Sequence, residues 1–329
     1  MSKKVSVIGG GSWATALVKI LAENKVHVTW YLRRKEQADA VNKNGANPDY
    51  LNFVSLNKPY VVATNDLDKA LDTSGYILFA IPSAHLPDVV SNMESNCLSD
   101  KKVIISIKGT VGASNLLPSS YISTCFGVSP EDVLVIGGPC HAEEIGLNQK
   151  TYMTLASVNE AFVASVEDFF CSSYIQINQS LDPVGVEYAA IYKNIIGIVS
   201  GMAKGLKYGD NFIAVLIANA IAELGELMQK INPTANISTS SYLGDLLVTA
   251  YSEHSRNRAF GELIGRGYDI LNIKEVTYMV AEGYPATKGI YETAQELDIN
   301  MPIVNTAYRI LYKHMPVSIE FKLLERSLK

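Results

Sequence analysis

The chain opens with a short apolar run that stops at three consecutive glycines. Val5–Ile8 has the length of a β-strand, the sequence GGGSWA follows it at residues 9–14, and an amphipathic segment at 12–23 comes next. In the pattern G-x-G-x-x-G/A, the first glycine makes a tight turn and the second lets the backbone approach a diphosphate. The small third residue lets the helix pack on the strand. A diphosphate here would meet the free N–H groups and positive dipole of a helix N-terminus. We therefore predict a dinucleotide-binding turn, with a tight turn that binds no ligand as the alternative. The predicted contacts in it are Gly9 and Gly11, and Trp13 is placed to cover one side of the cofactor.

The first 180 residues alternate short β-branched runs with segments of helical length. Candidate strands lie at 5–8, 26–32, 76–81, 103–107, 133–136, 152–156 and 174–177, with helix-length segments such as 12–23 and 83–93 between them. Unbroken apolar strands that alternate with helices predict a mostly parallel sheet covered on both faces.

The pattern changes near residue 180. Asp182-Pro183 fits an N-cap followed by proline at the first helical position, and no convincing strand follows it. Helical spacing marks the segments 184–204, 211–230, 255–266, 285–298 and 301–313. The sequence therefore predicts two domains: an α/β Rossmann-type NAD(P)-binding domain over 1–180 and an all-α substrate and catalytic domain over 181–329.

The second predicted strand ends at Arg33 and Arg34. A site that prefers NAD usually has Asp or Glu here, about 20 residues after the glycine turn, to bind the ribose hydroxyls. Arginine instead suits a 2′-phosphate, because its planar fork donates two hydrogen bonds at once. The pair favours NADPH, and two solvated residues at the start of a helix are the alternative. We expect Glu36 to belong to that helix.

The helix predicted at 184–204 carries a lysine in its middle. One turn on either side of Lys193 lie small or apolar residues such as Ala189, Ala190 and Gly197. Apolar surroundings disfavour the charged form of a lysine, which can prepare it for proton transfer, and small neighbours would let a ligand approach. The alternative is a lysine that extends its ammonium group to solvent. With Asn194 beside it, Lys193 is a catalytic candidate.

Polar residues elsewhere could meet at a ligand. Lys108 and the segment 137–144 each follow a predicted strand, and ligands of α/β proteins bind at the carboxyl ends of strands. The segment 255–258, Ser-Arg-Asn-Arg, combines a helix start with arginine and suits a phosphate, although an ordinary capped surface helix has the same pattern. Asp245 has leucine neighbours, so its carboxylate needs a partner such as a lysine.

Composition and charge exclude several classes of protein. The net charge of 28 − 33 = −5 argues against a nucleic-acid partner. The four cysteines contain no CxxC pair, which argues against a zinc ribbon or a thioredoxin-type site. A Cys140–His141 nucleophile is not expected, because neighbours in sequence rarely face each other productively, and a metal site at His141 and Glu144 is expected still less. No secretory signal is predicted, and charged residues interrupt the longest apolar stretch, 184–203, so we expect no membrane span and a cytoplasmic location.

Taken in order, these segments resemble the bacterial type of the NAD(P)-dependent glycerol-3-phosphate dehydrogenase family. The similarity covers the segments 9–17, 107–109, 138–144, 186–202, 243–249, 255–261, 280–288 and 301–312. It implies a Rossmann-type domain followed by a helical domain like that of 6-phosphogluconate dehydrogenase. It also implies reversible hydride transfer between NAD(P)H and dihydroxyacetone phosphate, giving sn-glycerol 3-phosphate for phospholipid synthesis, in a cytoplasmic enzyme that is often a homodimer.

The resemblance also implies roles for individual residues. Lys193 would donate and accept the proton on the C2 oxygen, and no metal would take part. The implied substrate contacts are Lys108, Gly138, Cys140, Lys193, Asn194, Asp245, Ser255, Arg256 and Asn257. The implied cofactor contacts are Ser12, Trp13, Arg33, Lys108, Ala142, Arg256, Val280 and Glu282, in addition to Gly9, Gly11 and Arg34, which the sequence pattern predicted above. Cys140 stands where the family usually has serine or threonine, Tyr152 replaces a proline or small residue, and the segment 47–52 lacks the usual Leu-Pro-Gly continuation.

Two other functions stay open at this level. A different β-hydroxyacid dehydrogenase of the same architecture would share the glycine turn and the helix lysine, but its substrate would carry a carboxylate instead of a phosphate. A non-catalytic dinucleotide-sensing module would need the turn but not Lys108, Lys193 and Asp245 together.

Overall fold

The computed structural model describes residues 3–112, 115–252, 255–270, 272–273 and 281–329. The chain forms two compact units, each described by itself below. Unit 1 comprises Met1–Ile107 and Leu116–Pro183, and unit 2 comprises Lys108–Asn115 and Val184–Lys329. The main division between the units falls after Pro183, and the sequence predicted a domain boundary at about residue 180. The segment Lys108–Asn115 belongs to unit 2, although it follows a strand of unit 1. A prediction with a single boundary at about residue 180 could not assign this segment to the second unit.

Unit 1 is built on one eight-stranded sheet in the order β3-β2-β1-β4-β5-β6-β7-β8. The strands are β1 Lys4–Ile8, β2 His27–Tyr31, β3 Val61–Thr64, β4 Tyr76–Phe79, β5 Lys102–Ile105, β6 Val133–Gly137, β7 Thr151–Ala156 and β8 Ile175–Ser180. The pairs from β3 through β6 are parallel, β7 is antiparallel to β6, and β8 is parallel to β7. The predicted fold class is confirmed. The reversal occurs at β7, after a link that contains the five-residue helix α6.

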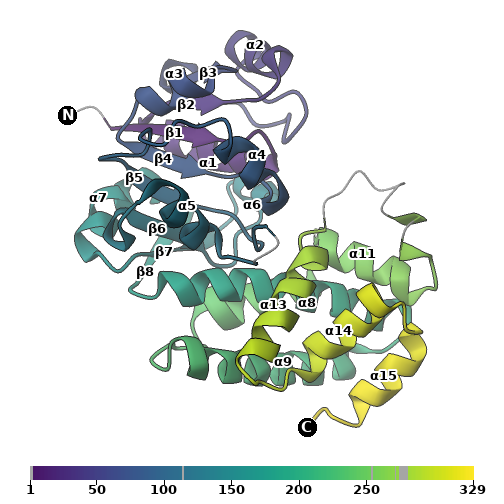
Figure 1. Cartoon of the computed structure of the whole chain (residues 1–329). Helices are drawn as coiled ribbons and strands as arrows, with labels where there is room; N and C mark the ends of the chain where they lie inside the picture. The colour runs from purple at the N-terminus through teal and green to yellow at the C-terminus, as the bar shows by residue number, and fades with distance from the viewer. Residues whose placement is uncertain (1–2, 113–114, 253–254, 271, 274–280) are drawn as a thin grey trace. The chain divides into compact units, whose positions relative to one another are not determined.

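Helices cover both faces of this sheet (Figure 1). Helices α1 Ser12–Glu23, α6 Ala142–Gly146 and α7 Glu160–Phe170 pack together on one face. On the other face are α3 Leu67–Asp72, α4 Leu86–Val90 and α5 Pro118–Phe126, while α2 Lys35–Asn44 packs on β3. The helix predicted at 83–93 is shorter than expected, because a 3₁₀ turn at Ser83–His85 precedes α4. With both faces covered, strand residues such as Val5, Val7 and Ile104 are fully buried.

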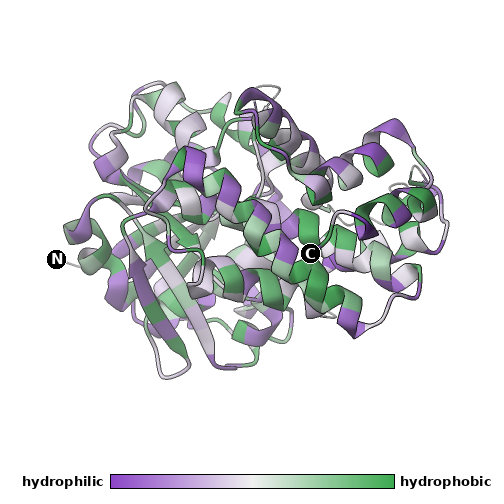
Figure 2. Ribbon diagram, turned by 90° about the horizontal axis from the view of Figure 1, so that it is seen from below, coloured by the Kyte–Doolittle hydropathy of each residue, from purple (hydrophilic) through white to green (hydrophobic). Residues whose placement is uncertain are grey.

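Unit 2 is helical, and its described residues contain no strand. The helices are α8 Pro183–Gly205, α9 Asp210–Ile231, α10 Asp245–Tyr251, α11 Arg256–Gly265, α13 Gly283–Glu296, α14 Pro302–Lys313 and α15 Val317–Glu325. The five predicted helices are confirmed, whereas α10 and α15 are additional. Figure 2 shows apolar and polar residues alternating along these helices, as expected of amphipathic helices that bury one side.

Glycines let α8 and α11 pack backbone against backbone. A Cβ atom on Gly201 would lie 2.0 Å from the carbonyl oxygen of Arg258, and one on Gly261 would lie 1.9 Å from that of Ile198. Real Cβ atoms do not approach so closely, so only glycine permits this crossing. Gly197, one turn after Lys193, faces the side chains of α10 and α11. The small size of Gly197 therefore lets α10 and α11 pack close to α8 at this point.

Helix α9 is long and apolar enough to cross a membrane by length and composition, with 44% of the relevant window buried. Its buried face carries Glu223, whose carboxylate accepts hydrogen bonds from the backbone N–H groups of Ile303 (2.8 Å) and Val304 (3.1 Å) in the first turn of α14. The hydroxyl of Tyr192 on α8 donates a third, at 3.2 Å. These contacts are typical of a core helix in a folded unit, and they join α8, α9 and α14.

Candidate active site

The glycine turn of unit 1 has the shape that a dinucleotide needs. Gly9 has φ = +133°, and a Cβ atom there would lie 2.2 Å from the carbonyl oxygen of Ala80, so no other residue fits. At Gly11, by contrast, a Cβ atom would meet nothing within 4 Å. Helix α1 begins at the next residue, and its N-cap residue, Gly11, has no side chain that could form a capping hydrogen bond. The open space beside Gly11 and the uncapped helix start fit a bound diphosphate.

Side chains behind the turn hold its carbonyl groups. The indole N–H of Trp30 donates to the oxygen of Gly9 at 2.5 Å. The amides of Gln37 and Asn47 both donate to the oxygen of Gly10, each at 3.1 Å, and Gln37 also donates to the Asn47 side chain at 2.9 Å. Asn47 is fully buried. Carbonyls fixed in this way direct the N–H groups of the same peptides to the opposite side, where the diphosphate is expected. Sequence reasoning missed Gln37 and Asn47, although Asn47 opens the segment 47–52 that it had singled out.

The two arginines after β2 differ in their surroundings. The guanidinium of Arg34 contacts the carboxylate of Asp49 at 2.5 Å and the side-chain oxygen of Gln37 at 3.4 Å. Arg33 is exposed, and among the residues that the structure describes its side chain has no partner. The indole of Trp13 donates to the Ser106 hydroxyl at 2.6 Å, beyond the end of β5.

The segment after β6 places the remaining predicted residues of unit 1. Gly138 has φ = +99°, and a Cβ atom there would lie 2.9 Å from the carbonyl oxygen of Tyr152. The same oxygen accepts a hydrogen bond from the thiol of Cys140, which is buried. The Nδ1 atom of His141, the N-cap residue of α6, lies 3.8 Å from the carboxylate of Glu144 in the first turn of that helix. Ala142 is the first residue of α6 and is buried.

In unit 2, Lys193 forms a buried ion pair. Its ammonium nitrogen lies 2.5 Å from a carboxylate oxygen of Asp245, and the two residues are 5% and 1% exposed. Lys193 therefore does not extend to solvent, and Asp245 has the lysine partner that its apolar neighbours indicated. Asp245 starts α10 directly after a π-helical turn at Ser240–Gly244, a distortion often found at functional sites. Its second carboxylate oxygen is buried and accepts no hydrogen bond from the described part of the chain.

A chain of amide hydrogen bonds runs beside this ion pair. The side chain of Asn194 donates to the backbone oxygen of Lys108 at 2.8 Å, and its own oxygen accepts from Asn257 at 3.0 Å. The oxygen of Asn257 in turn accepts the backbone N–H of Gly283, the first residue of α13, at 2.9 Å. Four predicted site residues, Lys108, Lys193, Asn194 and Asn257, are thus brought together with Asp245 within one unit.

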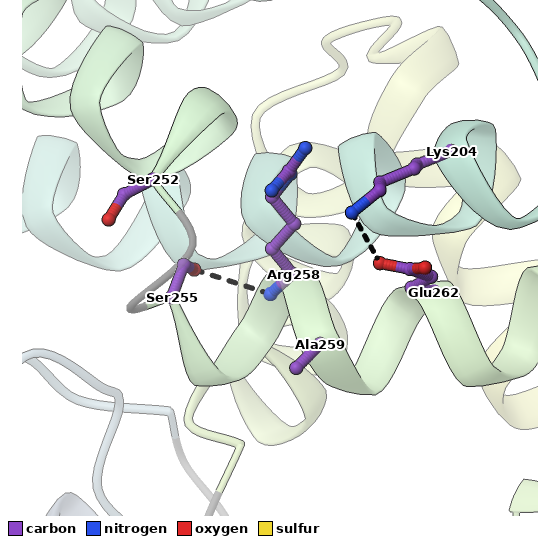
Figure 3. Close-up of a pocket in the computed structure, with 6 residues that line it drawn as sticks. All are labelled: Lys204, Ser252, Ser255, Arg258, Ala259 and Glu262. Atoms are coloured by element: carbon purple, nitrogen blue, oxygen red, sulfur yellow. Dashed lines mark hydrogen bonds and ion pairs between the residues drawn. The ribbon is translucent and has the colours of Figure 1, made fainter.

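The start of α11 carries the other residues that were predicted to bind a phosphate. Ser255 caps the helix by accepting the N–H of Arg258 at 3.2 Å, and Arg256 is exposed. A small cavity of about 110 Å³ lies on another side of this helix (Figure 3). Its lining includes Ser255 and Arg258 but neither Arg256 nor Asn257. The lining is completed by Lys204, Ser252, Ala259 and Glu262, with Lys204 paired to Glu262.

Comparison with known proteins identifies the family of the chain. The sequence profile of the NAD-dependent glycerol-3-phosphate dehydrogenase N-terminus matches residues 4–163, and that of the C-terminus of the same enzyme matches residues 182–322. The chain belongs to the NAD-dependent glycerol-3-phosphate dehydrogenase family. Glycerol-3-phosphate dehydrogenase [NAD(P)+] of Staphylococcus carnosus is 35% identical over 327 residues, which are 98% of this chain and 97% of that protein. The enzyme of the same name from Enterococcus faecalis is 35% identical over 95% of this chain and 92% of its own. The crystal structure of glycerol-3-phosphate dehydrogenase from Coxiella burnetii matches with a TM-score of 0.90 at 28% identity, covering 98% of both chains.

Membership of the glycerol-3-phosphate dehydrogenase family confirms the predicted resemblance and makes the protein an NAD(P)-dependent oxidoreductase. The predicted cofactor class, NAD or NADP, is confirmed at the same level. Two of the predicted cofactor contacts, Val280 and Glu282, lie just before α13 in the sequence. Glu282 immediately precedes α13, and Val280 lies outside the described residues. Within the described ranges, no group of three or more His, Cys, Asp or Glu side chains could hold a metal ion.

Proposed function

We propose that this protein reduces dihydroxyacetone phosphate reversibly to sn-glycerol 3-phosphate with NAD(P)H. The observation that carries the proposal is the buried Lys193–Asp245 ion pair, which lies beside the amide chain through Asn194 and Asn257. An ion pair this deep is costly to bury and adds little stability compared with apolar side chains. A catalytic use explains why it is there.

Ketone reduction requires a proton at oxygen and positive charge beside that oxygen. When bound, NAD(P)H supplies the hydride that goes to carbon. The ammonium group of Lys193 stabilises the negative charge that develops on the carbonyl oxygen and donates its proton to that oxygen. Asp245 holds the ammonium nitrogen in place through one carboxylate oxygen. The other oxygen, which accepts no hydrogen bond from any described residue, is suited to accept one from a substrate hydroxyl.

The other predicted residues take supporting roles in this proposal. Arg256 and Asn257, with Ser255, bind the phosphate, whose binding energy holds the ketone in position. Lys108, Asn194, Gly138 and Cys140 complete the substrate contacts. For the cofactor, the turn at Gly9, Gly11, Ser12 and Trp13 takes the diphosphate, and Arg33 and Arg34 face the adenosine ribose. Lys108, Ala142, Arg256, Val280 and Glu282 are the remaining proposed cofactor contacts.

We propose further that the enzyme is a cytoplasmic homodimer whose product supplies phospholipid synthesis. The outer face of α9 supports the dimer, because Ala214, Val215, Ala218 and Ala222 are exposed along it. An apolar helix face of this kind is typical of surfaces that pair with another copy. Light scattering after size-exclusion chromatography tests the assembly, and a monomer at micromolar concentration would contradict it.

A side-by-side assay tests the proposed reaction. Cofactor oxidation is followed spectrophotometrically with dihydroxyacetone phosphate, using NADPH and NADH in parallel reactions, and with a panel of keto acids as competing substrates. We expect turnover with the phosphorylated ketone and little with the keto acids. Turnover confined to keto acids would identify a β-hydroxyacid dehydrogenase. Binding of NADPH without any turnover would indicate a sensing module.

A further inference from the structure

We infer that Asp49 is a specificity-determining residue for the cofactor, and that it lowers the preference for NADPH over NADH. The inference rests on the proposed use of NAD(P)H. It starts from the contact between Asp49 and Arg34, the arginine that the sequence assigned to a 2′-phosphate. The Arg34 guanidinium lies 2.5 Å from the Asp49 carboxylate, so the group expected to bind phosphate already has an anionic partner from this chain.

The position of Asp49 is fixed relative to the dinucleotide turn. Its backbone N–H donates to the side-chain oxygen of Asn47 at 3.1 Å, and Asn47 is fully buried. The amide of Asn47 donates to the oxygen of Gly10 at 3.1 Å and to the Thr15 hydroxyl at 2.7 Å. The segment that carries Asp49 is therefore anchored to the turn that binds the diphosphate.

Asp49 therefore supplies a carboxylate near the glycine turn, where β2 itself ends without an acidic residue. In NAD-preferring sites, an acidic residue at the end of the second strand accepts hydrogen bonds from the ribose hydroxyls. Here β2 is followed by two arginines, and the carboxylate comes instead from the segment after α2. Asp49 contacts Arg34, the second residue of that arginine pair. A sequence search at the usual spacing from the glycine turn could not find it.

The charges set the direction of the effect. A phosphate monoester carries about −1.5 to −2 charges at neutral pH, so a 2′-phosphate near Arg34 must compete with the Asp49 carboxylate and is repelled by it. A ribose hydroxyl, by contrast, can donate to that carboxylate. The side chains of Arg34 and Asp49 are 54% and 40% exposed, so solvent screens the interaction and the expected effect is moderate. Arg33, which has no partner among the described residues, is the guanidinium that a 2′-phosphate meets without competition.

The test measures binding of two adenosine fragments, adenosine 2′,5′-bisphosphate and adenosine 5′-monophosphate, by isothermal titration calorimetry. The quantity compared is the ratio of their association constants in wild type, Asp49→Asn and the control Asp39→Asn, an exposed carboxylate on α2. We expect Asp49→Asn to raise the ratio about twofold to fivefold in favour of the bisphosphate, and Asp39→Asn to change it less than about 1.5-fold. The gain should shrink in an Arg34→Ala background, because part of it comes from releasing Arg34.

A second measurement separates this inference from the proposed reaction and from misfolding. Fragment binding needs no substrate turnover. It therefore tests the role of Asp49 even if the protein fails to reduce dihydroxyacetone phosphate. Asp49→Ala should raise the ratio in the same direction as Asp49→Asn, with melting temperatures within about 2 °C of wild type. A ratio that is unchanged or lower in both variants would overturn the inference. In an active enzyme, kcat/KM for NADPH relative to NADH should rise in parallel.

Discussion

The buried carboxylate of Glu223 should make the stability of unit 2 depend on pH, and Glu223→Gln should remove that dependence. Burial raises the pKa of Glu223 from an ordinary value of 4.5 to about 7, although hydrogen bonds from Ile303, Val304 and Tyr192 favour its ionised form. Tyr192 precedes Lys193 on α8, so Glu223 anchors the helix that carries the catalytic candidate.

The sign and size follow from linkage between proton binding and folding. The folded state holds the proton more tightly than the unfolded state, so this group contributes its full stability below about pH 4.5. That contribution is lost as pH rises through about 7. One pKa unit corresponds to about 1.4 kcal/mol, so the shift amounts to about 3 kcal/mol. Glutamine resembles the protonated acid at every pH. The free energy of unfolding of Glu223→Gln relative to wild type should therefore increase by about 3 kcal/mol between acid and alkaline pH.

Urea denaturation at about pH 5 and about pH 8.5 measures this difference. Far-UV circular dichroism is the suitable probe because unit 2 is helical. Tryptophan fluorescence is not, since the two tryptophans, Trp13 and Trp30, both lie in unit 1. Glu296→Gln, which removes an exposed carboxylate on α13 of the same unit, serves as the control and should show little pH-dependent change. A gap between Glu223→Gln and wild type that stays constant, or that narrows as pH rises, would refute the reasoning.

Three further predictions concern catalysis and packing. Lys193→Ala should lower kcat about 100-fold or more while changing KM less than about tenfold, since positioned proton transfer contributes about 10²–10⁴-fold; steady-state kinetics with unchanged kcat would exclude that role. Arg256→Ala should lower kcat/KM for dihydroxyacetone phosphate about 10- to 100-fold but not for phosphate-free dihydroxyacetone, and equal losses on both ketones would contradict phosphate contact. Gly261→Ala should lower the free energy of unfolding by at least about 2 kcal/mol, because its Cβ atom would lie 1.9 Å from a carbonyl oxygen of α8. The matched change Gly225→Ala in α9, which meets only a flexible Ile237 methyl group at 3.2 Å, should be neutral or stabilising, so equal denaturation midpoints for the two variants would disprove this account.

Most of the fold could be predicted from the spacing of hydrophobic residues along the sequence. The turn at 9–14 and α1 at Ser12–Glu23 were predicted because a glycine-rich turn between a strand and an amphipathic helix has few alternatives. Two elements were missed because they are short. β3 Val61–Thr64 and α10 Asp245–Tyr251 are too brief for a period to be read. The antiparallel direction of β7 is a property of strand pairing, which an apolar run does not reveal.

The candidate site was predictable where chemistry depends on residue type and not where it depends on contacts. A lysine amid apolar residues and a carboxylate between leucines each signalled an unusual environment, and the structure pairs Lys193 with Asp245. Gln37, Asn47 and Asp49 gave no such signal. Amides and a single acidic residue after a helix are common on surfaces, and only the folded chain shows them bonded to the glycine turn or to Arg34.

The surroundings of α8 explain how a buried ammonium group can be kept in one position. On one side, the glycine crossing locks α8 against the backbone of α11, and on another, Tyr192 is tied through Glu223 to the first turn of α14. Lys193 lies between these two restraints, so its backbone has little freedom to move when the charge on its ammonium group changes. The free energy needed to bury the Lys193–Asp245 pair is then supplied by the packing of the whole helix, and the orientation of the ammonium group is set before any substrate arrives. Loosening α8 at either restraint should therefore reduce kcat even where the ion pair itself is left intact.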